Sequence, residues 1–298
     1  MAKPFVKWAG GKTQLLPKIE DIIMKSLSLT KDFVYVEPFV GGGSVLFRLL
    51  DSCSTLKYAV INDANEQLMN LYSVIQDNDT YKEFKKISTH LCDTYNRDSM
   101  KQEKYNLVRY QYNHYIKGES KESSVWGAAA FLFLNKCSFN GLYRVNQKGE
   151  FNVPWGQKDY LRLYNEDEMD RCHVLLNEKV ICMCGDYQST DIIMEVEKKH
   201  GNLDVMFYLD PPYKPISQTS SFTQYTKDCF DDRNQEELKM FCDRINTNGY
   251  KFVQSNSKLE YFETLYNGYH IDTVSAKRNI NSDGKKRGSV EEILIYNE

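Results

Sequence analysis

The sequence lacks the cysteine and histidine spacings that mark metal sites. Its eight cysteines include no C-x-x-C pair, and its five histidines show no H-x-x-x-H spacing. We therefore expect no metal. A reducing compartment would keep the cysteines as thiols, so no disulfide is expected either.

Long apolar runs and internal repeats are also absent. The longest apolar run, near 128–134, is much shorter than the ~20 residues that a membrane-spanning helix needs, and the first residues lack the apolar core of a signal peptide. We expect a cytoplasmic protein with no membrane partner. The lack of repeats argues against a solenoid.

The net charge of −3 gives no excess of basic residues, but the charges are unevenly distributed. Residues 1–18 carry four lysines and no acid, residues 136–158 carry four bases and one acid, and residues 277–288 carry five bases and one acid. DNA responds to local patches rather than to the average charge. The distribution favours contact with DNA over the alternative that each segment is merely a solvated face.

Strand-like and helical segments alternate at both ends of the chain. The expected strands are 33–37, 58–62, 180–184, 205–209, 251–255 and 293–296, and the expected helices are 44–50, 66–76 and 235–245. This alternation predicts an α/β fold with a doubly wound, mostly parallel sheet. Polar, tyrosine-rich helical segments, an apolar helix and an Asn/Gly-rich stretch interrupt it. They predict an inserted, mainly helical domain at 77–171 between two parts of one catalytic domain, 1–76 and 172–298.

A glycine cluster, Gly41-Gly42-Gly43, separates the first strand from the first helix and would let the backbone approach a ligand. Leu46 stands where the dinucleotide fingerprint requires its third glycine, which disfavours a pyrophosphate. Asp63 ends the next strand about twenty residues on, where ribose hydroxyls are usually bound. Adenosine without pyrophosphate fits, and S-adenosylmethionine is such a ligand. A tight turn without a ligand, and an N-cap role for Asp63, remain the alternatives.

The segment Trp8 to Thr13 (WAGGKT) shares the end of the phosphate-binding P-loop motif, but Val6 stands where that motif needs its first glycine. An ATPase is therefore disfavoured. The remaining interpretation is a lysine, Lys12, that lies near a carboxylate or phosphate with an aromatic residue beside it.

The segment Asp210-Pro211-Pro212-Tyr213 follows an expected strand and is suited to work on an amine. Proline has no N–H, so carbonyl and carboxylate acceptors predominate there. Asp210 and the Pro211 carbonyl could accept both hydrogens of an exocyclic base amine, while Tyr213 stacks on the extruded base. A turn that merely ends a strand is the alternative. Methylation at C5 of cytosine is not expected, because the chain has no Pro-Cys dipeptide.

These motifs together resemble those of the Dam/DpnII-type adenine methyltransferases (D12 class, alpha group), and the resemblance covers nearly the whole chain. Further matching segments are NGLYRVN at 140–146, GEFNVPWG at 149–156, GDY at 185–187, SNS at 255–257 and KKRG at 285–288. The family implies a class I S-adenosylmethionine-dependent, Rossmann-like fold with an inserted target-recognition domain. It also implies direct methyl transfer to N6 of an adenine flipped out of duplex DNA, with GATC as the expected target, S-adenosylhomocysteine as the product and no metal.

The resemblance assigns roles to individual residues. Catalytic roles fall on Asp210, Pro211, Pro212 and Tyr213. Cofactor contacts fall on Trp8, Lys12, Glu37, Pro38, Phe39, Gly41, Gly43, Asp63, Asp186, Tyr187 and Asp210. DNA contacts fall on Lys7, Asn140, Leu142, Arg144, Asn146 and Pro154. Arg144 is the expected reader of a guanine, since arginine commonly binds O6 and N7 in the major groove; a phosphate contact or a surface ion pair is its alternative.

Two departures from the family pattern, Phe139 for tyrosine and Trp155 for phenylalanine, keep a packing role. A bacterial or phage origin is expected, and a genetic pairing with a restriction endonuclease stays open, with no stable protein partner. Methylation of N4 of cytosine or of RNA adenine would use the same geometry. A catalytically silent DNA-binding protein on this scaffold is the alternative from another class. Residues 81–124 show no identifiable chemistry.

Overall fold

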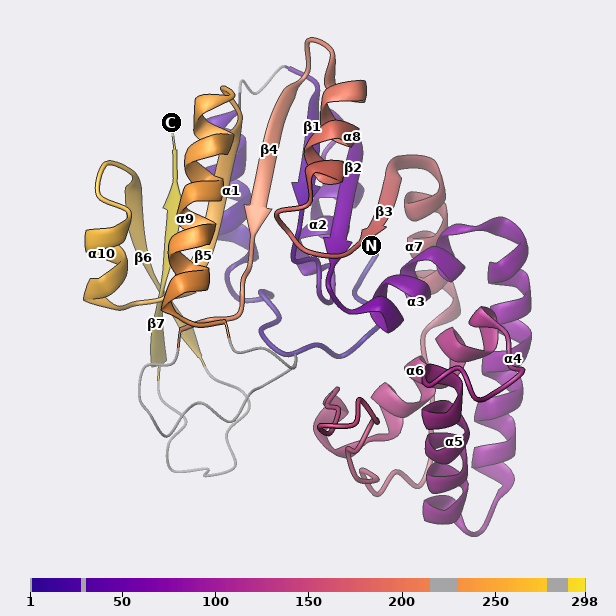
Figure 1. The fold of residues 1–298 in the computed structure, drawn as a ribbon. Helices are drawn as coiled ribbons and strands as arrows, with labels where there is room; N and C mark the ends of the chain where they lie inside the picture. Colours follow the sequence, from indigo (N-terminus) through magenta and orange to yellow (C-terminus); the bar gives the residue numbers. More distant parts are fainter. Residues whose placement is uncertain (1, 28–30, 215–229, 278–288, 298) are drawn as a thin grey trace.

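The computed structural model describes residues 2–27, 31–214, 230–277 and 289–297. An α/β unit built on one twisted sheet lies beside a smaller helical unit (Figure 1). The basic segment expected at 277–288 lies outside the described residues, apart from Lys277, the last residue of a strand.

The sheet has seven strands in the order β3-β2-β1-β4-β5-β7-β6. Strands β1 to β5 run parallel, and β7 is antiparallel to both β5 and β6. The predicted doubly wound, mostly parallel sheet is confirmed. The strands are β1 (Phe33–Glu37), β2 (Leu56–Asp63), β3 (Val180–Cys184), β4 (Asp204–Leu209), β5 (Lys251–Ser257), β6 (His270–Lys277) and β7 (Ser289–Tyr296).

Helices cover both faces of the sheet, so its central strand β1 is buried on both sides. Phe33 and Tyr35 belong to one apolar core, and Val34 and Val36 belong to the other, as the two-residue period of a strand requires. The helices of the first core are α1 (Leu16–Ser26), α2 (Ser44–Ser52), α3 (Glu66–Gln76) and α7 (Glu166–Lys179). Those of the second core are α8 (Thr190–His200), α9 (Asp232–Thr247) and α10 (Glu260–Leu265).

The helical unit is built around α6 (Ser124–Cys137), which is buried on almost every side and packs against α3, α4 (Asn78–Arg97) and α5 (Lys101–Ile116). A helix that is apolar all round belongs inside a core. The core of this unit is continuous with the first core of the sheet. After α6 the chain forms a short turn, η1 (Phe139–Gly141), and then an irregular hairpin, which we call the recognition hairpin (142–156).

The chain leaves the sheet after α3 and returns through α7, and the two crossing points are joined. Gln76 Nε2 donates to the Leu176 carbonyl (2.9 Å), and Asn177 Nδ2 donates to the Gln76 carbonyl (2.9 Å). The boundary that the sequence suggested at 171 falls inside α7, so the helix as a whole marks the return. Among the described residues, no helix combines the length and apolar character needed to cross a bilayer.

Candidate active site and DNA interface

The carboxyl ends of the neighbouring parallel strands β2, β1 and β4 meet at one edge of the sheet, the lower edge in Figure 1. Glu37 and Asp63 are the last residues of β1 and β2, and Asp210 directly follows β4. Open α/β sheets bind their ligands at this edge, where the strand order reverses. Three acidic side chains far apart in the sequence are therefore brought to one place.

The side chains of Trp8 and Tyr72 pack closely on the glycine turn after β1. Gly41 and Gly43 have positive φ angles, +48° and +72°. A Cβ atom on Gly41 would lie 2.8 Å from Cδ1 of Trp8, and one on Gly43 would lie 2.5 Å from the Tyr72 hydroxyl. Glycine is thus required for both conformation and space, and Trp8 packs directly on the turn.

The Asp63 carboxylate connects this turn to the next helix. Its Oδ2 accepts the Gly41 N–H (3.0 Å), and its Oδ1 accepts the Asn65 N–H (2.9 Å). The N-cap of α3 is Asn65, whose side chain accepts from Gln67 and Leu68, so the N-cap alternative for Asp63 is wrong. Burial raises the pKa of Asp63, and the two backbone donors oppose that shift.

Glu37 lies deeper in the same edge, with 2% of its surface exposed. Its Oε2 has no hydrogen-bond partner among the described residues. Burial raises the pKa of Glu37 well above its usual range, and the charge of Asp210 acts in the same direction. A buried carboxyl oxygen without a partner is the kind of group that a bound ligand completes, so the residues present fit an adenosine-type cofactor.

Aromatic rings close the β3 side of this region. The rings of Phe39 and Tyr187 lie 4.9 Å apart. Asn62 donates to the carbonyls of Pro38 (3.1 Å) and Gly185 (2.9 Å), and so holds the turns after β1 and β3 together. Asp186 is exposed and accepts the Gln188 N–H (2.7 Å).

The Asp210 carboxylate is held from two sides. Lys12 Nζ lies 2.8 Å from its Oδ2, and Ser255 Oγ donates to its Oδ1 (2.9 Å). Lys12 is 6% exposed, and its ammonium group lies 4.7 Å from the centre of the Tyr213 ring. The predicted lysine beside a carboxylate and an aromatic ring is confirmed. The two carboxylate oxygens are hydrogen-bond acceptors, and each is held in place by one of these partners.

A buried polar layer supports the Pro-Pro-Tyr turn. Gln235 Nε2 donates to the Pro212 carbonyl (3.3 Å), and Asn256 Nδ2 donates to Gln235 Oε1 (3.1 Å). The Tyr213 hydroxyl donates to Glu292 Oε2 (2.8 Å). Sequence reasoning missed Gln235, although its place on the otherwise apolar face of α9 is a usable signal.

The recognition hairpin is tied to the N-terminal segment by a residue that the sequence analysis did not single out. Asn135 is buried near the end of α6; its Oδ1 accepts the Lys7 N–H (2.8 Å), and its Nδ2 donates to the carbonyls of Lys7 (2.8 Å) and Gly141 (3.1 Å). A Cβ on Gly141 would lie 2.4 Å from Cδ of Lys7. Lys7 and the exposed Asn140 are thus neighbours, 133 residues apart in sequence.

The hairpin itself presents Arg144 to solvent. Arg144 Nε donates to Asn152 Oδ1 (2.8 Å), which orients the guanidinium group. Asn146 faces its own turn, where Oδ1 accepts the N–H groups of Lys148 (2.9 Å) and Glu150 (3.0 Å). Pro154 is exposed and Leu142 is half-buried. Five of the six expected DNA positions therefore lie on one turn and hairpin, next to Lys7.

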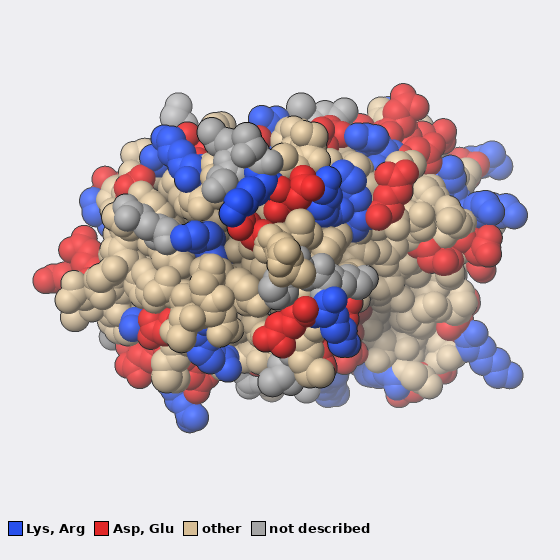
Figure 2. Space-filling view, turned by 90° about the horizontal axis from the view of Figure 1, so that it is seen from above, with Lys and Arg blue, Asp and Glu red and all other residues tan. Residues whose placement is uncertain are grey.

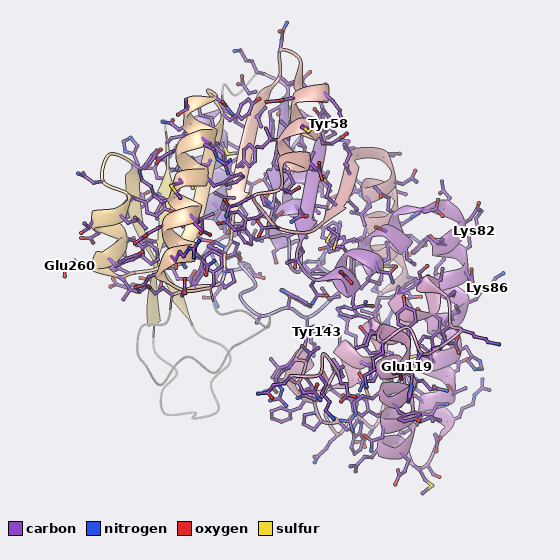
Figure 3. The ribbon with its side chains drawn as sticks, in the orientation of Figure 1. Tyr58, Lys82, Lys86, Glu119, Tyr143 and Glu260 are labelled. Carbon is purple, nitrogen blue, oxygen red and sulfur yellow. The ribbon has the colours of Figure 1, made fainter. Side chains whose placement is uncertain are left out.

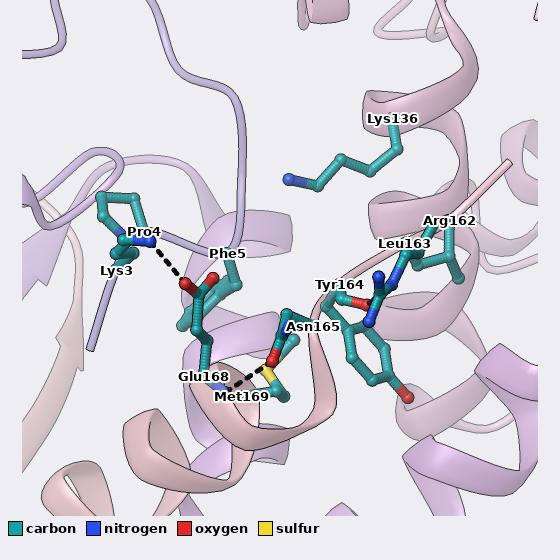
Figure 4. Close-up of a pocket in the computed structure, with 10 residues that line it drawn as sticks. All are labelled: Lys3, Pro4, Phe5, Lys136, Arg162, Leu163, Tyr164, Asn165, Glu168 and Met169. Carbon is teal, nitrogen blue, oxygen red and sulfur yellow. Dashed lines mark hydrogen bonds and ion pairs between the residues drawn. The ribbon is translucent and has the colours of Figure 1, made fainter. Parts of the chain in front are cut away.

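A separate cavity of about 280 Å³ lies between the N-terminal segment and the chain before α7 (Figure 4). Lys136 extends into it from α6, while Lys3 pairs with Glu168 (2.5 Å) at its wall. Burial lowers the pKa of Lys136 to about 8, and the charge of Lys7 adds to that effect.

On the face opposite the carboxyl edge of the sheet, basic and acidic side chains are mixed (Figure 2).

The fold and the carboxyl-edge site define a class I methyltransferase. The chain belongs to the family of D12 class N6 adenine-specific DNA methyltransferases, whose model matches residues 8–280. It is therefore an adenine-specific DNA methyltransferase, and this family and fold imply S-adenosylmethionine as the methyl donor and DNA as the substrate.

Two named relatives and one solved structure are similar to the chain over nearly its whole length. The chain is 41% identical over 298 residues to the type II methyltransferase M.MjaIII of Methanocaldococcus jannaschii, covering 99% of both chains. It is 32% identical to the DNA adenine methylase of Haemophilus influenzae, over 98% of this chain and 92% of that protein. Among solved structures, the rRNA methyltransferase AviRa of Streptomyces viridochromogenes aligns at 11% identity with a TM-score of 0.42, over 99% of this chain and 90% of that one.

Proposed function

We propose that this chain methylates N6 of the adenine in GATC sequences of duplex DNA, and that Asp210 to Tyr213 hold the target base. The observation that carries this proposal is the Asp210 carboxylate, fixed by Lys12 and Ser255 beside the glycine turn that Asp63 holds. A hydrogen-bond acceptor for the target amine thus lies at the same edge of the sheet as the expected cofactor site.

The side chains act on the amine as follows. The Asp210 carboxylate, paired with Lys12, accepts a hydrogen bond from the exocyclic amine, and the Pro211 carbonyl accepts the other. Both draw the nitrogen lone pair out of conjugation with the ring and toward the methyl donor. Ser255 fixes the orientation of the carboxylate. The nitrogen would take the methyl group directly, with no covalent enzyme intermediate and no metal. The sulfur–methyl bond would break to leave S-adenosylhomocysteine, and one amine proton would pass to water.

The cofactor would lie along the carboxyl edge and supply an electrophilic methyl group. Trp8, Lys12 and the turn from Glu37 to Gly43 would form its floor, with Asp63 toward the ribose. Phe39, Asp186 and Tyr187 would lie beside its adenine.

The adenine must leave the duplex to reach this edge, so the proposal includes base flipping. Unstacking costs a few kcal/mol, and stacking of the flipped base on Tyr213 recovers about 1–3 kcal/mol. Arg144, oriented by Asn152, would read a guanine of the target, with Lys7, Asn140, Leu142 and Pro154 on the surrounding DNA.

The test is methylation of plasmid DNA in cells that express the chain. We expect the plasmid to resist an endonuclease that adenine methylation at GATC blocks, and nucleoside mass spectrometry to show N6-methyladenine. Asp210→Asn keeps the shape of the side chain and removes its charge, so single-turnover methylation, measured below the melting temperature of the variant, should fall by about 10²-fold or more. Loss of the partner of the buried Lys12 should also lower that melting temperature. Full cleavage of the wild-type plasmid would overturn the GATC target, and a variant within threefold of wild type would overturn the role of Asp210.

M.MjaIII is named a type II methyltransferase. By analogy, we propose that this chain protects DNA against a companion restriction endonuclease. Transformation of a host with such an endonuclease gene, taken from the same locus, should succeed only when the methyltransferase is already expressed.

A further inference from the structure

Tyr143, Phe151 and Val153 are the buried side chains of the recognition hairpin, and Tyr143 is the one next to Arg144. Tyr143 lies between Leu142 and Arg144, and successive side chains of an extended segment face opposite sides. Arg144 is exposed, whereas Tyr143 is only 7% exposed. Figure 3 places Tyr143 where the helical unit faces the carboxyl edge of the sheet.

The ring of Tyr143 contacts the cover of the glycine turn. It stacks on Trp8, with ring centres 5.7 Å apart and planes 25° apart. Trp8 in turn packs so closely on Gly41 that a single added Cβ there would lie 2.8 Å from its ring. A displacement of the hairpin is therefore transmitted through two stacked rings to the turn.

A second route from Tyr143 to the same turn runs through its hydroxyl, near which the side chains of Asn65 and Tyr112 lie. Both side chains oppose the rise in the Tyr143 pKa that burial causes. The Asn65 N–H holds Asp63 Oδ1, and the Gly41 N–H holds Asp63 Oδ2. The ring route and the hydroxyl route both end at the Asp63 carboxylate.

We propose that Tyr143 is a positioning residue that couples the recognition hairpin to the cofactor turn, so that specific DNA and the cofactor strengthen each other's binding. The inference rests on the proposed function, because it takes the hairpin to bind DNA and Asp63 to bind the cofactor. Coupling of this kind is reciprocal: the factor by which DNA raises cofactor affinity equals the factor by which cofactor raises DNA affinity.

The experiment measures this factor with S-adenosylhomocysteine and a GATC duplex, titrating each ligand with and without the other. We expect about a fivefold or larger factor in the wild type, which lies in the usual range for coupled sites. Tyr143→Leu removes both routes and should bring the factor to within twofold of one. Tyr143→Phe keeps the ring and removes the hydroxyl, so an intermediate factor is expected, in a protein whose core is unchanged in shape.

Tyr95→Phe is the matched control. The Tyr95 hydroxyl accepts from the Trp155 indole (2.9 Å) at the other end of the hairpin and donates to the Lys158 carbonyl. This variant should keep the wild-type factor.

Three results would overturn the inference: no coupling in the wild type, an unchanged factor in both Tyr143 variants, or an equal loss of coupling in Tyr95→Phe. A wild-type chain that bound neither ligand would instead refute the proposed function. Weaker binding of both ligands with an unchanged factor would show that Tyr143 only stabilises the fold.

Discussion

Burial of the charged ammonium group of Lys136 destabilises the folded protein. Burial lowers its pKa to about 8, whereas an exposed lysine in the unfolded chain titrates near 10.4. The folded protein therefore binds fewer protons than the unfolded chain between these two values. The penalty is complete below pH 8 and fades as the pH rises toward 10.4, because both states then carry the neutral amine.

We expect Lys136→Met to raise the melting temperature at pH 7 and to have a smaller effect at pH 9.5, measured by thermal unfolding at both pH values. Lys86→Met, on the exposed outer side of α4, is the control and should show no such pH dependence. A gain of the same size at both pH values would show that burial of the charge is not its cause.

The turn between β1 and α2 is the element on which the cofactor edge depends. Gly43→Ala combines a positive φ with a Cβ 2.5 Å from the Tyr72 hydroxyl. Gly118→Ala is a matched control, because Gly118 also has a φ of +72° but no atom within 4 Å of the added Cβ. We expect about 1 kcal/mol of destabilisation at Gly118 and about 2–4 kcal/mol at Gly43, measured by urea unfolding. Equal losses would mean that Tyr72 moves aside freely.

Substitutions in the recognition hairpin should distinguish a residue that reads a base from one that contacts a phosphate. Arg144→Ala should lose about 1–3 kcal/mol of discrimination at one base pair, measured by competition among duplexes with single substitutions in GATC. Asn152→Ala releases the guanidinium group and should weaken discrimination at the same base pair by less. Uniform weakening on all duplexes would assign Arg144 to a phosphate.

Sequence patterns predicted the elements whose signals are local. The central strands are short apolar runs, and the motifs at their ends meet because parallel strands share one carboxyl edge. The missed elements are α1, α7, α8, α10 and β6, of which α10 is short and β6 lies at an edge of the sheet. The last of these, β6, alternates polar and apolar residues at the edge of the sheet, and α1 lacks a side-chain cap.

Sequence could not supply contacts whose partners are distant in the chain. Asn135 looks like one polar residue in an apolar helix until Lys7, 128 residues earlier, is placed beside it. Gln235 similarly acquires a role only when the Pro212 carbonyl is placed above it. The individual roles in catalysis and DNA reading remain predictions, because they depend on a ligand's position.

At the scale of the whole molecule, the net charge of −3 and the expected DNA binding are compatible only if the basic groups act locally. Binding to the duplex should weaken as salt rises, with a slope of about −0.9 in log affinity against log salt for each phosphate contacted. Lys7→Met, at an exposed lysine expected to contact DNA, should reduce the size of this slope by about 0.9, whereas Arg144→Ala, a base reader, should change it little. A slope near zero in the wild type would contradict the assignment of the basic segments to DNA.

The joined crossing points at Gln76 and Asn177 have an evolutionary consequence. The helical unit leaves and rejoins the sheet at one place. Its loops can therefore change in length and sequence without disturbing the strands whose ends form the methyl-transfer site. Its helices are less free, because α6 shares its core with the sheet. If the hairpin reads the target, as proposed, descendants of this chain could acquire new target sequences by exchanging the hairpin alone. An exchange of the entire helical unit would have to bring a compatible α6.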